Sequence, residues 1–446
     1  MSIFRDTDQS EDNSMRRTIP LFLCCLALAC AALSVSPRTS VEADALQSGG
    51  KLQWYKGNMH THSHWSDGDD YLEMIGAWYR DHDYQFLVFT DHNILANKER
   101  WVVVEKTKGG KKAYDKLKAA YPEWIEERTN DDGALEVRLR RFDEVSERLN
   151  QPGKFLLIQG EEISDSFHRH PIHLNASNVK ELVAPRHGTS IAETIQNNVD
   201  AVMNQRERTG QPMIIHLNHP NFGYAVTAED LMRIQGEKFF EVYNGHPGVH
   251  NSGDETHAST ERIWDIVLAQ RLGRLDLPVM YGLATDDGHN YHNIPSRASE
   301  PGRGWVMVLA QELTAAALIE SLENGHFYSS SGVVLESVRS DGKSLTVKAQ
   351  SRGDETFTFE FLGTRKSTPL DGEPILDKDG QPLATTHRYS DKVGEVLKTS
   401  SGESATYEFD GDELYVRCRV TSSQKHPNPS EIGEHERAWT QPVIPE

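Results

Sequence analysis

Between residues 50 and 333, short apolar segments alternate with segments of helical period, and almost every apolar segment ends in histidine, aspartate or glutamate. The runs "WYKGNMH", "YQFLVFTDH" and "KFLLIQGEE" are three examples. Strands that alternate with helices predict a parallel α/β sheet, and this many units favour a closed or nearly closed barrel of the TIM type. In such barrels the carboxyl ends of the strands form the active-site face. We therefore expect the polar residues to meet at one end of the barrel.

Two stretches depart from this alternation. Residues 98–150 are highly charged, and they predict a mostly helical, solvated insertion on the barrel rim. From 334 to 446, short alternating segments such as "SLTVKAQ" and "TFTFEFLG" are separated by clusters of Gly, Asp, Asn and Pro. This second pattern predicts a small antiparallel β-sandwich that follows the barrel as a separate domain.

The N-terminal segment, residues 1–43, has the character of a targeting sequence. After Arg16 and Arg17 comes the apolar run "TIPLFLCCLALACAALSVSP", which suits a signal-peptide core better than a full membrane span of about 20 residues. We expect export to the periplasm or the extracellular space, with cleavage after Ala43 or near Ser36. An uncleaved membrane anchor, or a lipid attached at Cys30, is the alternative.

Cysteine content and charge limit the classes of partner. Three of the four cysteines lie in the N-terminal segment, so Cys418 is left alone after cleavage and no intramolecular disulfide can form. Its context, "LYVRCRV", indicates a buried small hydrophobic residue. The net charge of −20 disfavours nucleic acid and anionic membranes as partners, but a cationic metal site would still attract a phosphate. Membrane contact is expected only through the N-terminal segment.

The polar residues that end the apolar segments are candidate metal ligands. Six imidazoles and three carboxylates would converge at high cost without a cation, because desolvated polar groups must be paired. Nitrogen and oxygen ligands without thiolate point to zinc, manganese or iron rather than calcium. Nine ligands exceed the needs of one ion, so two or three divalent ions are expected. The nine residues are His60, His62, Asp67, His92, Glu162, His173, His219, Asp287 and His289.

The motifs around these residues resemble, in order and context, those of the polymerase and histidinol phosphatase (PHP) family. They are "HTHSHWSDG", "TDHN", "GEEIS", "IHLNA", "LNHPN" and "TDDGH", and together they extend over roughly residues 52 to 333. The resemblance implies a distorted (β/α)7 barrel of the TIM type. It also implies a cluster of up to three metal ions at the carboxyl ends of the strands.

Carried over to this chain, the resemblance implies three sets of ligands. His60, His62, Glu162 and Asp287 would hold one ion, Glu162 would bridge to a second held by His173 and His219, and Asp67, His92 and His289 would hold a third. The family often has histidine where this chain has Asp67. Glu161 points to the opposite face of its strand from Glu162, and the spacing to "IS" favours Glu162. We interpret Asp91 as an acceptor behind the ligands rather than as a ligand.

Five further residues are candidates for contact with the substrate. Asn244, His246 and His250, in "EVYNGHPGVH", follow a predicted barrel strand and could contact substrate or donate a proton. Arg297 and Arg303 could grip a phosphate with their guanidinium forks, or could pair with acids on the rim.

The expected reaction is hydrolysis of a phosphate ester by a hydroxide that bridges two of the ions. Export argues against a biosynthetic or replication role, so the expected substrate is a small organic phosphate or nucleotide. Two alternatives stay open. One is an amidohydrolase-like enzyme that cleaves an amide or lactone, although that superfamily commonly uses a carbamylated lysine where this chain has Glu162. The other is a secreted binding protein without catalytic activity.

Overall fold

The computed structural model describes residues 51–236 and 238–446. The predicted signal peptide or anchor, residues 1–43, lies outside the described residues. None of the described helices combines the length and the apolar character that a membrane span requires.

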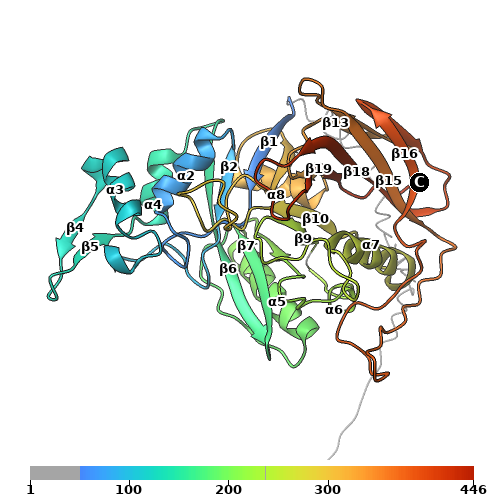
Figure 1. Ribbon diagram of the computed structural model, residues 1–446, viewed down its shortest axis with the longest axis horizontal. Helices are drawn as coiled ribbons and strands as arrows, with labels where there is room; N and C mark the ends of the chain where they lie inside the picture. Colours follow the sequence, from blue (N-terminus) through green and yellow to red (C-terminus); the bar gives the residue numbers. More distant parts are fainter. Residues whose placement is uncertain (1–50, 237) are drawn as a thin grey trace, which may run out of the picture. The chain divides into compact units, whose positions relative to one another are not determined.

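Thirteen strands form one continuous sheet in the order β10-β9-β8-β7-β6-β2-β1-β11-β12-β19-β18-β15-β16 (Figure 1). Strands β1, β2 and β6 run parallel, and so do β8, β9 and β10. Strand β7 is antiparallel to both of its neighbours, and β11 is antiparallel to β1. The chain is therefore of mixed α/β class, and the prediction of a parallel sheet is only partly correct. The strands up to residue 333 are β1 (Gln53–Asn58), β2 (Phe86–Phe89), β6 (Leu156–Phe167), β7 (His170–Ser177), β8 (Ile214–Leu217), β9 (Phe239–Asn244), β10 (Tyr281–Thr285), β11 (Trp305–Ala310) and β12 (Phe327–Ser330).

The turn after β6 explains the first departure from parallel order. Phe167 pairs with His170, so only His168 and Arg169 connect β6 to β7. His168 adopts a positive φ of 53° in this turn. Because so short a turn can join only antiparallel strands, β6 and β7 form the long hairpin seen in Figure 1.

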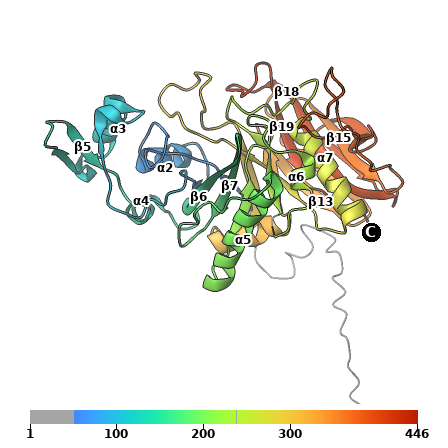
Figure 2. The ribbon, with the colours of Figure 1, turned by 90° about the horizontal axis from the view of Figure 1, so that it is seen from below.

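Helices connect most of the remaining strands of this part. Their bounds are α2 (Leu72–Asp81), α5 (Ile191–Thr209), α6 (Ala228–Leu231), α7 (Thr260–Gln270) and α8 (Ala315–Glu323). Helix α5 carries a cap at both ends: the Ser190 side chain accepts the Glu193 N–H, and Gly210 adopts a φ of 66°. In Figure 2 α5 lies beside β6 and β7.

The sheet curls so that the carboxyl end of β1 meets the segment that follows β10. Thr61 forms an isolated parallel bridge with Gly288, and the His62 N–H donates to the Gly288 carbonyl at 2.9 Å. The Asp286 N–H donates to the Asn58 side chain at 3.0 Å. These bonds bring the polar residues after β1 and those after β10 to the same end of the sheet.

The insertion between β2 and β6 contains strands as well as helices. Its elements are β3 (Trp101–Val103), α3 (Gly110–Ala120), β4 (Glu127–Thr129), β5 (Leu135–Arg138) and α4 (Phe142–Leu149). The strands form a small sheet of their own in the order β3-β5-β4. The prediction of a mostly helical excursion is therefore only partly correct: "WVV" is a short apolar run rich in β-branched valine, and "LEVR" alternates apolar and charged residues, as strands do.

The last 113 residues, 334–446, form antiparallel strands, as predicted. Strands β13, β14 and β17 make a separate sheet, while β19, β18, β15 and β16 extend the main sheet beyond β12. Side chains of β14 and β15 share one hydrophobic core, and Cys418 lies fully buried in it, as its context predicts. The strands are β13 (Leu335–Ser340), β14 (Ser344–Ala349), β15 (Phe357–Arg365), β16 (Glu395–Gly402), β17 (Ser404–Glu408), β18 (Glu413–Lys425) and β19 (His435–Thr440).

The predicted boundary at 333 and 334 does not separate two independent sheets. Strand β12 pairs with β19, with Tyr328 opposite Thr440. On the next strand, the Arg417 guanidinium binds both carboxylate oxygens of Asp265 in α7, at 2.9 and 2.7 Å, and all of these groups are buried. The C-terminal strands are therefore built into the same structure as the sheet that precedes them.

Candidate metal centre

All nine predicted ligands come together at one end of the main sheet. They fall into four overlapping groups, and within each group the ligand atoms lie within 4.8 Å of one another. His60 and His62 follow β1, His92 follows β2, and His219 follows β8, while Glu162 and His173 lie within the β6–β7 hairpin. The groups are His60, His62 and Glu162; His60, His219 and Asp287; His92, Glu162 and His173; and His62, Asp67, His92 and His289.

Two imidazole nitrogens face two carboxylate oxygens. Nε2 of His60 and Nε2 of His62 lie 3.1 Å apart, and each lies 3.2 to 3.4 Å from Oε2 of Glu162 and from Oδ1 of Asp287. Around a tetrahedral ion with bonds of about 2.0–2.1 Å, ligand atoms lie roughly 3.3–3.4 Å apart. All four side chains are buried. Both the spacing and the donor set therefore fit a divalent cation.

The other oxygen of Glu162 faces a second set of imidazoles. Its Oε1 lies 2.9 Å from Nδ1 of His173 and 3.6 Å from Nε2 of His219. This Nδ1 of His173 is buried, and its contact with Glu162 does not have hydrogen-bond geometry. A buried nitrogen without a hydrogen bond is costly, so this atom also fits a metal ligand. The two oxygens of Glu162 thus face two neighbouring candidate ion positions.

Asp67 lies close to three imidazoles of the third set of candidate ligands. Its Oδ1 lies 3.2 Å from Nε2 of His289, 3.4 Å from Nε2 of His92 and 3.8 Å from Nδ1 of His62. This oxygen is buried and lacks a hydrogen-bond partner in the described part of the chain. Aspartate here, where the resembled family often has histidine, therefore still presents a ligand atom to the neighbouring imidazoles.

The charges within the cluster stabilise one another. Burial alone would raise the pKa of Glu162, but His92, His173 and His60 hold the pKa of this carboxyl well below its usual range. The same balance applies to Asp287, whose pKa is held down mainly by His60 and His62. Both carboxyls are therefore ionised and available to a cation at neutral pH.

Glu241 is a residue of the site that the sequence analysis missed. It is fully buried in β9, and its Oε1 lies 2.7 Å from Nδ1 of His60 and 2.8 Å from the Thr285 hydroxyl. Its Oε2 accepts the His219 N–H and the Asn244 amide, each at 2.8 Å. A single acid in the otherwise apolar run "FFEVYN" was the available signal.

Two aspartates next to predicted ligands are structural. Asp91 accepts hydrogen bonds from the backbone N–H and hydroxyl groups of Ser63 and Ser66, at 2.6 to 3.0 Å. Asp286 accepts the Tyr79 hydroxyl at 2.8 Å and the Arg303 N–H at 2.6 Å. Asp91 is therefore an acceptor behind the ligands, as interpreted, although its donors are serines rather than an imidazole.

Two of the five predicted substrate contacts have other partners. Arg303 is fully buried, and it donates to Gly245, Ala298 and Asn428 carbonyls and to the side chains of Glu300 and Asn428. Its donors are therefore satisfied within the protein, and it pairs with an acid, Glu300, which is one of the two alternatives that the sequence left open. Asn244 donates to Glu241 and, at 3.2 Å, to Asp287, so it positions these carboxylates instead of facing a substrate.

The other three differ in how close they lie to the cluster. The ring of His246 lies 5.7 Å from that of His289, and its Nδ1 accepts the Gly248 N–H at 2.9 Å. Burial lowers the pKa of His246 to about 4, so the neutral ring carries its proton on Nε2. His250 stacks on Tyr224 at 5.0 Å, outside the four groups. Arg297 lies on an exposed loop with a positive φ of 71°.

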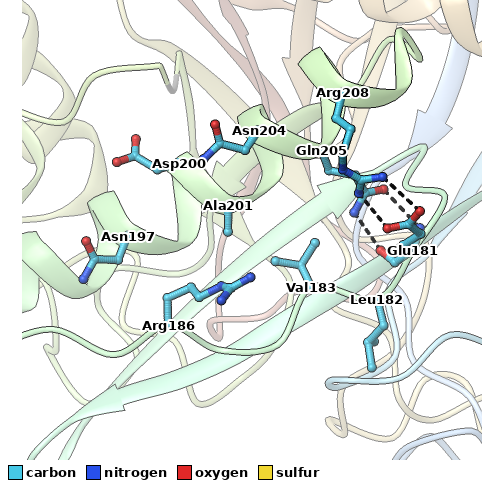
Figure 3. Close-up of a pocket in the computed structure, with 10 residues that line it drawn as sticks. All are labelled: Glu181, Leu182, Val183, Arg186, Asn197, Asp200, Ala201, Asn204, Gln205 and Arg208. Carbon is cyan, nitrogen blue, oxygen red and sulfur yellow. Dashed lines mark hydrogen bonds and ion pairs between the residues drawn. The ribbon is translucent and has the colours of Figure 1, made fainter.

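A separate concave feature lies on the other face of β6. Helix α5 and the segment before it line a cavity of about 540 Å³, at whose edge Arg208 pairs with Glu181 at 2.6 Å (Figure 3). The N–H of Val183, which also lines the cavity, donates to Glu161. Glu161 and Glu162 point to opposite faces, as predicted, so the cavity and the metal cluster are distinct.

Comparison with known proteins yields structural likeness alone. No family model matches the chain, and no curated protein matches it. A two-domain protein from Bacteroides vulgatus ATCC 8482, named as containing a predicted PHP-like metal-dependent phosphoesterase, is 14% identical, with a TM-score of 0.37. The match covers 87% of this chain and 95% of that one.

Two further structures match a smaller share of this chain. A protein from Bifidobacterium adolescentis ATCC 15703, provisionally named a metal-dependent phosphoesterase, is 14% identical with a TM-score of 0.30, over 60% of this chain and 96% of its own. An amidohydrolase from Chromobacterium violaceum, with bound sulfate and no metal, is 14% identical with a TM-score of 0.26, over 52% and 87%. Two of these three similar structures are thus named as metal-dependent phosphoesterases, one of them as PHP-like.

Proposed function

We propose that the protein is a metal-dependent phosphoesterase that hydrolyses the phosphate ester of a small organic phosphate or nucleotide. The observation that carries this proposal is the convergence of nine buried or partly buried imidazoles and carboxylates in four overlapping groups, two of which share Glu162. Such a donor set fits two or three divalent ions, and zinc, manganese and iron suit its mixture of nitrogen and oxygen.

The groups divide among three proposed ions. One would be held by His60, His62, Glu162 and Asp287; the next by Glu162, His173 and His219; and the third by Asp67, His92 and His289. When bound, such ions polarise a phosphoryl oxygen and lower the pKa of water from about 15.7 toward about 7, which makes it a nucleophile at neutral pH.

The chain's own residues orient this centre. Glu241 accepts the Nδ1 proton of His60 and so leaves the Nε2 lone pair free to bind a cation. The Asn218 amide donates to Oε1 of Glu162 at 2.8 Å and fixes the plane of that carboxylate. His246 would present its Nε2–H to a phosphoryl or leaving-group oxygen bound beside His289.

The alternative is an amidohydrolase-like enzyme that cleaves an amide or lactone. Its chemistry would use the same ions, but its bridging group is commonly a carbamylated lysine. The group shared by two ligand sets in this chain is the carboxylate of Glu162, which favours the phosphoesterase. A binding protein without activity would have no need of three adjoining ligand sets.

The test is hydrolysis by the protein after loading with zinc, manganese or iron. We expect metal-dependent release of phosphate from phosphomonoesters or diesters, and its loss in the double variant His60→Ala, His62→Ala. An amide and a lactone substrate form the second arm. Hydrolysis of the amide or lactone alone would establish the amidohydrolase-like enzyme. Inactivity on all of these substrates would leave only the binding protein.

Finer assignments of fold, location and substrate belong to the same proposal. We infer that the curled sheet is a distorted seven-stranded barrel and that the C-terminal strands form a β-sandwich, supported by the bridge between Thr61 and Gly288 and by the core that β14 and β15 share. We infer export from residues 1–43. The net charge of −20 favours a small anionic substrate over nucleic acid.

A further inference from the structure

Three lysines of the insertion reach toward the loops that carry the metal ligands. Lys108, Lys112 and Lys116 are spaced four residues apart, just before and along α3. Lys112 donates to the side chain of Asn293 at 2.6 Å, and Lys116 pairs with Asp70. Lys108 pairs with Asp67, whose other oxygen faces His92 and His289. The insertion therefore places positive charge beside the candidate metal centre.

The backbone next to Lys108 is held against the site by a close approach. A Cβ atom at Gly109 would collide with the carbonyl oxygen of Asp69, so only glycine permits this packing. Lys116 then fixes α3 to the same loop through the buried carboxylate of Asp70. Lys108 is thus a positioned residue, although its side chain is long.

Lys108 itself retains unused hydrogen-bonding capacity. Its Nζ donates to Oδ2 of Asp67 at 3.0 Å, and it has no other hydrogen-bond partner within residues 51–236 and 238–446. Its side chain is 55% exposed. An ammonium group has three donors, so two remain for a ligand. Asp67 accordingly lies between the ammonium group of Lys108, which has two unused donors, and the proposed third ion.

We infer that Lys108 binds the phosphate group of the substrate and gives the enzyme a preference for phosphomonoesters over diesters. This inference rests on the proposed function and names its substrate class. A phosphomonoester carries nearly two negative charges at neutral pH, because its second pKa is about 6, whereas a diester carries one. Coulomb attraction to a fixed ammonium is therefore about twice as strong for the monoester.

The alternative hypothesis is that Lys108 only neutralises the charge of Asp67. The two hypotheses predict different effects when Lys108 is replaced by a neutral residue. If Lys108 supports Asp67, its replacement weakens metal retention and leaves phosphate affinity of the loaded protein unchanged. If it binds phosphate, metal retention is kept and phosphate affinity falls.

The experiment compares Lys108→Met and Lys108→Arg with the control Lys111→Met. Lys111 lies three residues further along, in α3, is 66% exposed and pairs with Asp115, so its replacement removes the same charge away from the site. Inorganic phosphate is titrated calorimetrically into each zinc-loaded protein, and zinc content is measured in parallel. We expect about tenfold weaker phosphate binding in Lys108→Met, and near wild-type binding in Lys108→Arg and Lys111→Met.

Catalysis provides the second readout. With p-nitrophenyl phosphate and its bis-p-nitrophenyl diester, Lys108→Met should lose more kcat/KM on the monoester than on the diester. Three outcomes would overturn the inference. Lys108→Met and Lys111→Met could bind phosphate equally well, Lys108→Met could lose zinc while its phosphate affinity stays unchanged, or the wild type could fail to bind phosphate. A wild type that binds phosphate but hydrolyses neither ester would instead refute the proposed function.

Discussion

His60 Nδ1 lies 2.7 Å from Oε1 of Glu241, and both side chains are completely buried. This pair joins β9 to the loop after β1, and it determines which nitrogen of His60 faces the other ligands. A carboxylate that accepts the Nδ1 proton leaves the lone pair on Nε2, which is the atom that lies 3.1 to 3.4 Å from His62, Asp287 and Glu162.

Glu241→Gln should lower zinc affinity by about 10- to 100-fold. A glutamine oxygen can still accept the His60 proton, but its amide group would then face the His219 N–H and the Asn244 amide, which are both donors. Competition with a chromophoric chelator measures the affinity. Unchanged affinity in a folded variant would show that Glu241 does not orient His60.

The neighbouring acids of β6 offer a matched pair of variants. Glu162→Gln should abolish binding of at least one ion, because both of its oxygens face ligand groups. Glu161→Gln should keep the metal content of the wild type. Burial raises the pKa of Glu161 to about 8, so its carboxyl is mostly protonated at pH 7 and resembles the amide that replaces it.

Metal analysis of the two purified variants by mass spectrometry decides this prediction. Equal metal loss in both would contradict the opposite orientation of the two side chains. Equal retention in both would remove Glu162 from the ligand set.

The grouping of the nine candidate ligands could be predicted from the sequence because most of them lie within a strand or just after one, in recognisable motifs. His60 and His62 lie two residues apart just after β1, and "TDDGH" brings Asp287 and His289 after another strand. Glu241 was missed because its partners come from other strands, and a single acid in an apolar run does not identify them. The choice between the two roles of Arg303 could not be made from the sequence, because charge alone does not reveal burial.

The sheet was predicted less completely than the site. Alternating strands and helices indicate parallel order, but the two-residue turn at His168 and Arg169 makes β7 antiparallel. The pairing of β12 with β19 joins segments more than a hundred residues apart, with Tyr328 opposite Thr440. Local sequence patterns contain no information on such pairings, because they depend on which strand edges are left free.

Arg303→Lys should destabilise the protein by about 2–4 kcal/mol while leaving phosphate affinity of the folded, zinc-loaded protein unchanged. A lysine cannot replace the five donors that Arg303 directs at the segments of Gly245, Ala298 and Asn428, and it would leave buried carbonyls unpaired. Urea unfolding measures the loss. Arg297→Lys, on an exposed loop, is the control and should unfold as the wild type does. A selective rise in phosphate Kd at unchanged stability would restore Arg303 as a substrate contact.

A chain that ends at residue 333 should fail to fold cooperatively. It would lose the β19 partner of β12, the buried ion pair between Arg417 and Asp265, and Trp439, whose ring stacks on Tyr243 at 5.6 Å. Thermal unfolding followed by circular dichroism, with size-exclusion chromatography, tests this expectation. A monomeric, cooperatively unfolding and metal-binding product would show instead that residues 334–446 are a separable domain.

Glu73 should lower the free energy of unfolding as pH rises from about 4.5 to about 7. This side chain lies in the first turn of α2, is 3% exposed, and its Oε2 has no hydrogen-bond partner among the described residues. Burial raises its pKa from 4.5 to about 7. The folded state therefore keeps a proton that the unfolded state has lost, so stability falls as pH rises from about 4.5 to about 7 and then levels off.

Glu73→Gln removes this loss because glutamine is neutral at every pH in the range. The variant should match the wild type near pH 4.5 and exceed its free energy of unfolding by about 3 kcal/mol at pH 8. Urea unfolding at several pH values measures the difference, and any contribution of the metal centre cancels because both proteins share it. Glu147→Gln, at an exposed position of α4, is the control and should follow the wild type throughout. A difference between Glu73→Gln and the wild type that does not grow with pH would mean that Glu73 is ionised in the folded protein.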